Sequence, residues 1–410
     1  MKVLLLSPFF YPEAISTGKY NTALAEALVD AGAKVQVVAS HPLYPSWKPT
    51  FSDAKLDQVT IVRGGAWLRY PRAMLLRRAV FEVWYTFHVL KTMCLKRFNP
   101  DLVVAVFPPT LFFYVVSALF RSGVRRVGIV HDFQSALAFS QDPGPFRRLL
   151  RQTVRALDRK SFQRCDTLVV LSNAMARAAV KDYDVRSDQT IVAYPFVTMM
   201  PRQETGKELA AVLPDGVQHV VYSGALGNKQ NPFALFDFFQ IATAQFPDVH
   251  FHICSAGPIF EELCSRHSRS PAEGLHLRSL VDEANLWELY CRSTIQIIPQ
   301  ADGSADACLP SKLPNIVASG CLILAICDSN SELAQIVRQC WGTSVSIWDS
   351  EVLFAALESL LDRAQKQTAA ERRRKAAHLV SKYFDINATV KAVLGLSREE
   401  DEPVETVAKS

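Results

Sequence analysis

The sequence predicts an α/β protein made of two successive doubly wound domains, each with a parallel sheet between layers of helices. Three observations support this prediction: a length of 410 residues, an alternation of short β-rich runs with helical patterns, and a pause in that alternation near the middle. A single hydrophobic core stops growing near about 250–300 residues, so more than one domain is expected. A hydrophobic content of 49% fits a folded globular protein.

The first half starts with an apolar strand and continues as alternating helices and strands. Residues 17–31 carry alanine and leucine at helical spacing, and Gly32 ends that helix. Strands are expected at residues 3–6, 35–39, 60–63, 102–106, 127–130 and 168–171. This β-α-β order implies a parallel sheet with helices on both faces.

Residues 102–120 are the one segment that resembles a membrane span, because all 19 residues are uncharged. Pro108 and Pro109 split this run into LVVAV and TLFFYVVSALF. A buried strand, a turn and a helix are the favoured interpretation, because proline interrupts a helix.

The alternation pauses near residues 195–205 and then begins again. The second set of strands is expected at residues 219–223, 249–255, 275–280, 295–299, 322–327 and 344–347. We therefore expect an N-terminal domain over 1–196 and a C-terminal domain over 197–384, with a linker at about 196–212. The last residues, 398–410, form a polar tail that is expected to fray.

The nine cysteines lie mostly in apolar runs and form no C-x-x-C pair. We interpret them as reduced thiols of a cytoplasmic protein, with no disulfide framework and no zinc site. The opening MKVLLLSPFFYP lacks the small-residue cleavage site of a signal peptide and is better explained as a core strand.

Charge is distributed unevenly along the chain. Residues 1–196 carry 26 Lys+Arg and 14 Asp+Glu, a balance of +12, whereas residues 197–410 carry 19 and 26, a balance of −7. This asymmetry suggests that the first half meets an anionic partner. Basic residues with interleaved aromatics gather in residues 69–97, and a second basic stretch covers residues 147–164. An anionic membrane surface, a nucleic-acid face or a solvated amphipathic helix would each explain such stretches.

Ligands of open α/β sheets bind at the carboxyl ends of the strands, which gives two candidate positions in the first half. Gly18 and Lys19 open a helix after the first strand, where backbone N–H groups attract phosphate. His131 follows the strand GIV, and a neutral imidazole there could bond a sugar hydroxyl. A simple helix cap and a structural histidine are the alternatives.

Two further loops in the second half suit a pyrophosphate. Ser223, Gly224 and Lys229 follow the strand HVVYS and precede a helix, so backbone N–H groups and one ammonium are available. Ser311 and Lys312 follow the strand IQIIP and are expected at a helix start.

Two side chains further along could complete this site. Asn315, about one turn after Ser311, could reach a ribose hydroxyl, and Glu332 follows the strand LILAI. A tight turn with a solvated lysine and an ordinary capped loop are the alternatives. No D-x-D or other metal-ligand set and no hydrolytic triad is recognised, so neither a metal nor a cofactor is expected.

These motifs together resemble the retaining GT-B glycosyltransferase family 4, and within it the colanic-acid-type exopolysaccharide transferases. The segments that carry the resemblance span residues 1 to about 335 in order: SPFFYPEAISTGKYNTALAEAL, SHPLYPSWK, FPPTLF, HDF, VYSGALGNKQ, SAGPIFEEL, LPSKLPNIVASG and SNSEL. The resemblance implies two Rossmann-like domains that face a central cleft. It also implies that a C-terminal helix, residues 385–397, crosses back to the N-terminal domain.

The resemblance implies that the C-terminal domain binds a UDP- or GDP-sugar without a metal. Lys229 would hold the diphosphate, and Ser311, Lys312 and Leu313 would lie beside the phosphates and the nucleoside. Gly18 would face the diphosphate, and His131 would lie near the transferred sugar, which makes His131 and Lys229 the expected catalytic residues.

The chain departs from the family pattern at two places. Ala307 and Asn315 stand where the E-x7-E glutamates are usual, and Ala225 lies near the usual arginine.

The expected activity is retaining transfer of a sugar to a lipid-linked or growing saccharide in cell-surface polysaccharide synthesis. The expected location is the cytoplasmic face of the inner membrane, bound through residues 69–97 and 147–164, without nucleic acid. A non-catalytic scaffold that binds nucleotide is one alternative, suggested by the missing carboxylates and arginine. A sugar-nucleotide epimerase on the same fold is the other, and a basic, aromatic surface argues against it.

Overall fold

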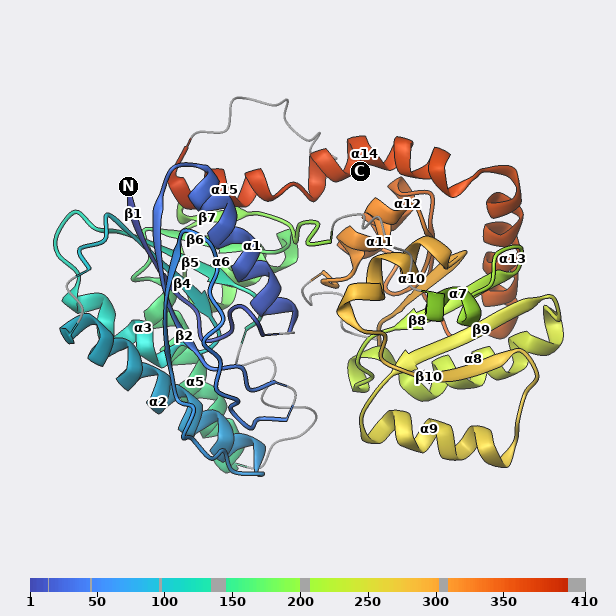
Figure 1. Ribbon diagram of the computed structural model, residues 1–410, viewed down its shortest axis with the longest axis horizontal. Coiled ribbons are helices and arrows are strands. Elements are labelled where there is room, and N and C mark those ends of the chain that lie inside the picture. Colours follow the sequence, from blue (N-terminus) through green and yellow to red (C-terminus); the bar gives the residue numbers. More distant parts are fainter. Residues whose placement is uncertain are drawn as a thin grey trace. The chain divides into compact units, whose positions relative to one another are not determined.

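The computed structural model describes residues 1–13, 15–44, 46–95, 98–133, 145–199, 207–301 and 309–396. The chain forms two compact units (Figure 1). Unit 1 comprises Met1–Tyr194 and the segment that begins at Ile386, and unit 2 comprises Pro195–Asp385. The polar tail expected at 398–410 lies outside the described residues.

Unit 1 is built on a seven-stranded sheet with the order β3-β2-β1-β4-β5-β6-β7. Its strands are β1 (Lys2–Leu6), β2 (Lys34–Ser40), β3 (Val59–Gly64), β4 (Leu102–Phe107), β5 (Arg125–Val130), β6 (Thr167–Val170) and β7 (Thr190–Val192). Every pairing is parallel, which the expected β-α-β order requires. The first six strands are where the sequence predicts them, and β7 was not predicted.

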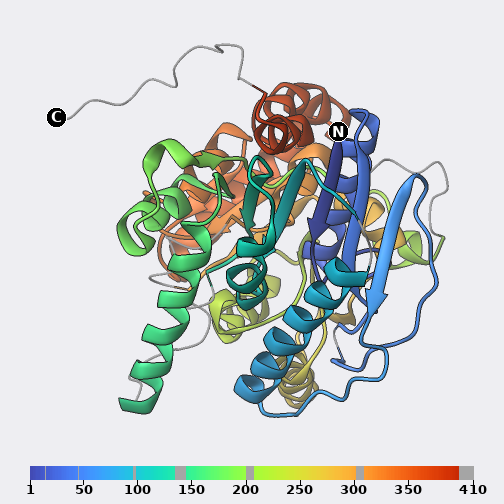
Figure 2. The ribbon, with the colours of Figure 1, turned by 90° about the vertical axis from the view of Figure 1, so that its left-hand side faces the viewer.

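Helices cover both faces of this sheet. They are α1 (Ser16–Asp30), α2 (Met74–Leu95), α3 (Leu111–Val116), α5 (Pro145–Phe162), α6 (Asn173–Tyr183) and α15 (Ile386–Leu394). Buried leucine and valine side chains of α1 and α15 share one hydrophobic cluster with β1, β2 and β4. The helices α2, α3 and α5 lie on the other side (Figure 2). Aromatic rings pack between these helices and the sheet. Tyr85 of α2 meets Phe112 of α3 at a ring-centroid distance of 5.0 Å, and Phe162 of α5 meets Phe107 of β4 at 5.3 Å.

The uncharged run 102–120 is a strand, a turn and a helix, as the sequence predicts. It forms β4, which is buried along its whole length, then α3 and the short 3₁₀ helix η1 (Ser117–Leu119). Within the described residues, no helix combines the length and the apolar character needed to cross a bilayer.

Unit 2 contains a six-stranded parallel sheet with the order β10-β9-β8-β11-β12-β13. Its strands are β8 (Gln218–Ser223), β9 (Val249–Ser255), β10 (Leu275–Ser279), β11 (Ile295–Pro299), β12 (Leu322–Ile326) and β13 (Thr343–Val345). All six were predicted, and the bounds differ by at most two residues.

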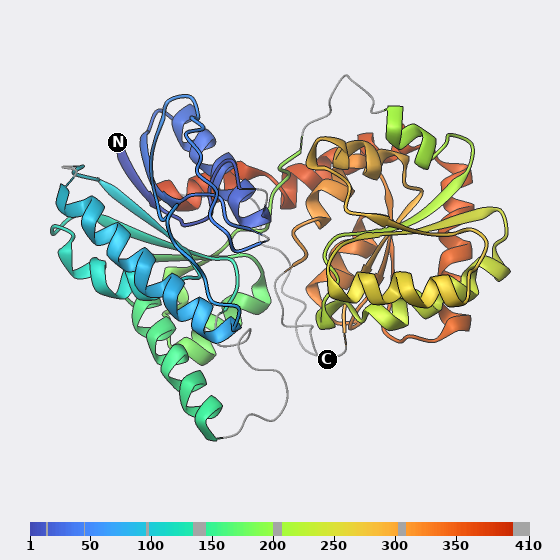
Figure 3. The ribbon, with the colours of Figure 1, turned by 60° about the horizontal axis from the view of Figure 1, so that its bottom comes forward.

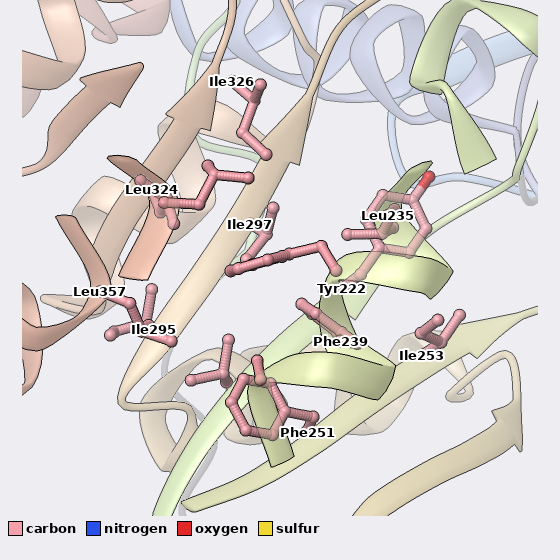
Figure 4. Packing of buried hydrophobic residues seen from close by; sticks show 14 of the residues in the cluster. Tyr222, Leu235, Phe239, Phe251, Ile253, Ile295, Ile297, Leu324, Ile326 and Leu357 are labelled. Atoms are coloured by element: carbon pink, nitrogen blue, oxygen red, sulfur yellow. The ribbon is translucent and has the colours of Figure 1, made fainter. Parts of the chain in front are cut away.

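Both faces of the second sheet are also covered by helices (Figure 3). These are α7 (Lys207–Val212), α8 (Pro232–Gln245), α9 (Pro258–Arg269), α10 (Leu286–Arg292), α11 (Leu313–Ser319), α12 (Glu332–Gln339), α13 (Ser350–Lys366) and α14 (Ala369–Tyr383). Leu235 and Phe239 of α8 and Leu357 of α13 pack on Tyr222 and the isoleucines of β11 (Figure 4). Leu289 of α10 belongs to a smaller cluster with Val221.

Candidate functional site

In unit 2, the predicted donor-binding residues follow three neighbouring strands. Ser223 ends β8, Lys312 lies in the loop after β11, and Glu332 begins the helix after β12. Because β8, β11 and β12 are adjacent and parallel, their carboxyl ends form one edge of the sheet. The sheet therefore gathers these loops, although 109 positions separate the numbers of Ser223 and Glu332.

The Lys312 side chain turns inward to this edge. Its Nζ donates to the carbonyl oxygen of Ser223 at 3.2 Å and to that of Ile297 at 3.4 Å. The same ammonium lies over the ring of Tyr222, 4.2 Å from the centroid, where the π face attracts a cation. The contacts of Lys312 thus connect β8 with β11.

Burial gives Lys312 an unusual charge state. The loss of water around the ammonium lowers its pKa from 10.5 to about 7. An ammonium has three donors, and two of them point at the carbonyl groups of Ser223 and Ile297. An anion placed next to Lys312 would favour the protonated form, so charge on this lysine is tied to what binds beside it.

Lys229 lies in the loop after β8, in the 3₁₀ turn η3 (Asn228–Gln230). Its side chain is exposed, and its carbonyl oxygen accepts the N–H of Ala301 at 2.8 Å. That bond joins the loop after β8 to the loop after β11. The two loops that carry Lys229 and Lys312 therefore lie side by side.

Gly224 gives the first of these loops its sharp turn. Its φ of +143° is a conformation that side chains with a Cβ rarely adopt. The Gly224 N–H donates to the carbonyl oxygen of Cys254 at 3.0 Å, which continues the ladder between β8 and β9. Ser223 is buried, and the contribution it makes in the structure is its carbonyl oxygen.

Asn315 is buried and forms hydrogen bonds within unit 2. The side chain is 3% exposed, and its Oδ1 accepts the N–H groups of Thr198 at 3.0 Å and Met199 at 3.2 Å. Its Nδ2 donates to the Thr198 hydroxyl at 3.2 Å. The amide thus anchors the segment that enters unit 2, and these three bonds use only one of the two N–H donors of Nδ2.

The remaining residues of this edge differ in exposure. Leu313 is fully buried and its N–H donates to the carbonyl oxygen of Pro310, so its part in the structure is packing. Ser311 is exposed, and Glu332 is half-buried at the start of α12. Ala307, the other position of the usual glutamate pair, lies outside the described residues.

In unit 1, Gly18 and Lys19 lie in the first turn of α1. A Cβ added to Gly18 would stand 2.9 Å from the carbonyl oxygen of Glu13, so the close approach of this loop explains the glycine. The buried Glu13 carboxylate accepts the N–H groups of Leu43 at 2.8 Å and Tyr44 at 3.1 Å. Glu13 therefore ties the loop after β1 to the loop after β2.

His131 directly follows β5, as expected. The backbone N–H of His131 donates to the carbonyl oxygen of Phe107 at 2.9 Å. The centroid of its ring lies 6.1 Å from that of Tyr20 in α1. Burial lowers the pKa of His131 to about 4, so the imidazole is neutral at pH 7. Nε2 is a buried ring nitrogen with no hydrogen-bond partner among the described residues. A neutral ring with an unused nitrogen is suited to a hydroxyl group.

Two residues that shape these sites were not identified from the sequence. Tyr222 lies under the Lys312 ammonium, but an aromatic residue in an apolar strand looks like ordinary core. Glu13 stands five residues before the predicted Gly18, in the loop after β1, and it bonds to a loop 30 residues away. An acid within an otherwise apolar opening was the available signal for Glu13.

Comparison with known proteins finds a family model that matches part of the chain. Residues 17–199 match the model of the family described as Glycosyltransferase Family 4. The chain carries a glycosyltransferase family 4 domain. The chain is 23% identical over 390 residues to WcaI of Escherichia coli strain K12, whose name describes a colanic acid biosynthesis glycosyl transferase. The match covers 90% of this chain and 94% of WcaI.

Solved structures share the fold of this chain. Sucrose-phosphate synthase of Thermosynechococcus elongatus has a TM-score of 0.69 at 16% identity, with 97% of each chain covered. WaaG, a glycosyltransferase involved in lipopolysaccharide biosynthesis, has a TM-score of 0.67 at 13% identity, with 96% of this chain and 100% of WaaG covered. HepE of Anabaena, solved with UDP-glucose, has a TM-score of 0.58 at 16% identity, with 96% and 98% covered. The chain is a glycosyltransferase with two Rossmann-like domains of the GT-B type.

Proposed function

We propose that this enzyme transfers a sugar from a UDP- or GDP-sugar to a lipid-linked or growing saccharide during cell-surface polysaccharide synthesis. The observation that carries the proposal is the pair of lysine-bearing loops, after β8 and β11, at one edge of unit 2. The departing nucleoside diphosphate gains negative charge, and ammonium groups positioned beside it would stabilise that charge as it develops. The names of WcaI, WaaG and HepE supply the polysaccharide and nucleotide-sugar context.

In this proposal the residues have separate roles. Lys229 and Lys312 bind the diphosphate, with Ser223, Gly224, Ser311 and Glu332 lining the same edge. Gly18 and Lys19 contact the phosphates from unit 1, and His131 bonds a hydroxyl of the transferred sugar through its neutral ring. Because lysine supplies the positive charge, no divalent metal is needed in the donor site. Retention of anomeric configuration is proposed because the motifs resemble the retaining family.

The decisive experiment replaces Lys229 and compares two ligands. Lys229→Ala is expected to lower sugar transfer by about 10²-fold, the scale of removing one charge-stabilising donor. UDP and GDP are first screened by thermal shift, because binding raises apparent stability. The preferred diphosphate should then bind Lys229→Ala more weakly, whereas the matching nucleoside without phosphates should bind both proteins alike.

Lys375→Ala, an exposed lysine of α14, is the matched control and should behave as the parent. All assays contain EDTA, and transfer is expected in its presence. Unchanged transfer by Lys229→Ala would contradict the assignment. Tight diphosphate binding with no turnover on any donor and acceptor pair would instead favour a nucleotide-binding scaffold.

We also propose that α2 and α5 contact an anionic membrane surface. Each helix has one acidic residue, and both of these acids turn inward to the start of α3. Glu82 accepts the N–H of Leu111 at 2.9 Å, and Asp158, which is fully buried, accepts the Thr110 hydroxyl at 2.8 Å. The exposed residues of α5 are mainly basic and those of α2 mainly apolar, and anionic lipid attracts both kinds.

The exposed apolar side chains of these helices support the same proposal. They are Met74, Leu76, Val83, Phe87 and Leu95 of α2 and Leu149 of α5, all at least 47% exposed. Part of the basic charge of α5 is already neutralised, because Arg155 pairs with Asp182 at 2.9 Å and Arg159 pairs with Asp184. Apolar contact is therefore expected to matter beside charge.

Vesicle co-sedimentation tests this surface. The protein should bind vesicles that contain anionic lipid, release them at high salt, and bind neutral vesicles weakly. Phe87→Ser combined with Leu76→Ser should reduce binding severalfold, and Ile241→Ser, an exposed apolar site on α8 of unit 2, should not. Equal binding by all three proteins would refute this surface as the contact.

A further inference from the structure

Four histidines stand together on one face of the unit 2 sheet. His219 lies on β8, His250 and His252 lie on β9, and His276 lies on β10. His219 is level with His250, and His252 is level with His276, so all four side chains leave the sheet on the same side. Their positions in the sequence conceal this cluster, because only the H-x-H spacing on β9 is local.

Three of these rings present nitrogens at metal-binding distances. One ring nitrogen from each of His219, His250 and His252 lies within 4.8 Å of the others. His219 Nδ1 and His252 Nε2 are 3.1 Å apart. Two imidazole ligands on a tetrahedral zinc ion, each with a bond of about 2.0–2.1 Å, have nitrogens about 3.3 Å apart. This pair is therefore already close to ligand spacing, and the His250 nitrogen, within 4.8 Å of both, would have to complete the set.

The tautomer of His219 is fixed in the way a metal ligand requires. Its Nε2 lies 3.0 Å from the carbonyl oxygen of Pro214, and since a carbonyl only accepts, Nε2 carries the proton. The lone pair of Nδ1 then points toward His252. Metal-ligating histidines commonly donate their other N–H to a backbone carbonyl in this manner.

Two further ring nitrogens of the cluster, outside the pair formed by His219 Nδ1 and His252 Nε2, have no partner within the part of the chain that the structure describes. His252 is 1% exposed, and its Nδ1 has no hydrogen-bond partner among the described residues; the same is true of His276 Nε2. Arg278 lies two residues after His276 on β10, and its charge acts on the rings of both His276 and His252; the trio does not include His276. His250 is half-buried and gives an ion access from solvent.

We propose that His219, His250 and His252 form a zinc-binding site in unit 2, separate from the donor site. Imidazole ligands suit zinc among the common divalent cations, and three of them leave a fourth position for water. When zinc binds His252 Nε2, the proton of that ring moves to Nδ1, so the neutral ring keeps one proton. His219 is the second residue of β8 and Ser223 the last, which places the site about 13 Å along the strand from the donor edge. The ion would join β8, β9 and the Pro214 loop without touching the donor.

The test uses the full-length protein after removal of metal with EDTA and dialysis. Zinc chloride should bind saturably with one ion per chain and raise the apparent melting temperature. Cobalt(II) should give the visible d–d absorption of a four- or five-coordinate site. His250→Gln changes a half-buried ligand, so folding is preserved, and it should weaken zinc binding at least tenfold.

His378→Gln, an exposed histidine of α14, is the control and should bind zinc as the parent does. Thermal melting in EDTA checks that both variants are folded. If His250→Gln is unfolded, His252→Gln serves as a second variant. UDP or GDP binding should be the same with and without zinc, which separates this site from the donor site. Equal zinc affinity in the parent and His250→Gln, or no saturable binding, would overturn the proposal.

Discussion

The Lys312 ammonium meets two carbonyl groups and an aromatic face at the edge where the donor diphosphate is proposed to bind. Its pKa of about 7 means that most of this lysine is neutral at pH 8 in the free protein. A diphosphate beside it favours the charged form, so the protein is expected to take up most of a proton when the nucleotide binds at pH 8. Affinity should accordingly fall as the pH rises from 7 to 9.

Calorimetry at pH 8 in two buffers with different ionisation enthalpies measures this uptake directly. The apparent binding enthalpy should depend on the buffer for the parent and for Lys375→Met. Lys312→Met has no group to titrate and should show no such dependence. A buffer-independent enthalpy in the parent would show that Lys312 does not change its charge on binding.

Some contacts of single residues could not be predicted from the sequence. Ser223 and Lys312 were each selected from their positions after strands, but the contact between them depends on β8 and β11 being neighbours in the sheet. The histidine cluster depends on the same kind of information, the order of β8, β9 and β10. Asn315 was expected beside a ribose from its position in the chain. Its bonds to the backbone of residues 198–199 arise from tertiary folding and leave no signal in the sequence.

At the scale of elements, one arginine forms hydrogen bonds with the end of the C-terminal helix α15. Arg125 at the start of β5 donates to the carbonyl oxygens of Val393 at 3.1 Å and Ala392 at 3.2 Å, and to the Thr167 hydroxyl at 3.1 Å. Cations near a helix C-terminus stabilise its unpaired carbonyl groups. Arg125 therefore complements the apolar packing of Val390 and Val393 on unit 1.

Arg125→Ala is expected to lower the free energy of unfolding by about 2 kcal/mol, the scale of hydrogen bonds that involve a charged group. Amide exchange in α15 should become faster. Arg126→Ala is the matched control, because its ion pair with Asp166 is partly exposed and such pairs contribute under about 1 kcal/mol. An equal loss in both variants, or unchanged exchange in α15, would show that packing alone holds the helix.

Most elements were predictable because parallel strands buried on both faces appear as short apolar runs bounded by turns. Strand β7 was not predicted because its three residues are only half-buried and follow the polar turn at Ser187–Gln189. Periodicity reports burial, so an edge strand with little burial gives little signal.

For the whole molecule, buried neutral histidines should limit stability in acid. Burial lowers the pKa of His131 to about 4 and also lowers that of His88, whereas an unfolded histidine titrates near about 6.5. Between these values the unfolded chain binds more protons than the folded one, so folding stability falls as the pH falls from about 6.5 toward 4. Each such histidine lowers the free energy of unfolding by at most about 1.4 kcal/mol per pH unit in this range.

Urea unfolding at pH 7, 6 and 5, with EDTA present, measures this dependence. His131→Gln removes one titrating group and should lose less stability over this range than the parent. His378→Gln, at an exposed position, should follow the parent. Parallel curves for all three proteins would show that His131 is not part of the acid response.

The path of the chain also dictates when each unit can fold during synthesis. Unit 2 is inserted into unit 1, and a hydrogen bond from Val197 N–H to the Phe384 carbonyl, 3.1 Å long, holds its two ends together. A nascent chain can complete unit 2 as soon as residue 385 has left the ribosome. Unit 1 must wait for α15, which covers part of its apolar core, so a chain that stops before Ile386 leaves the earlier-made half exposed to aggregation.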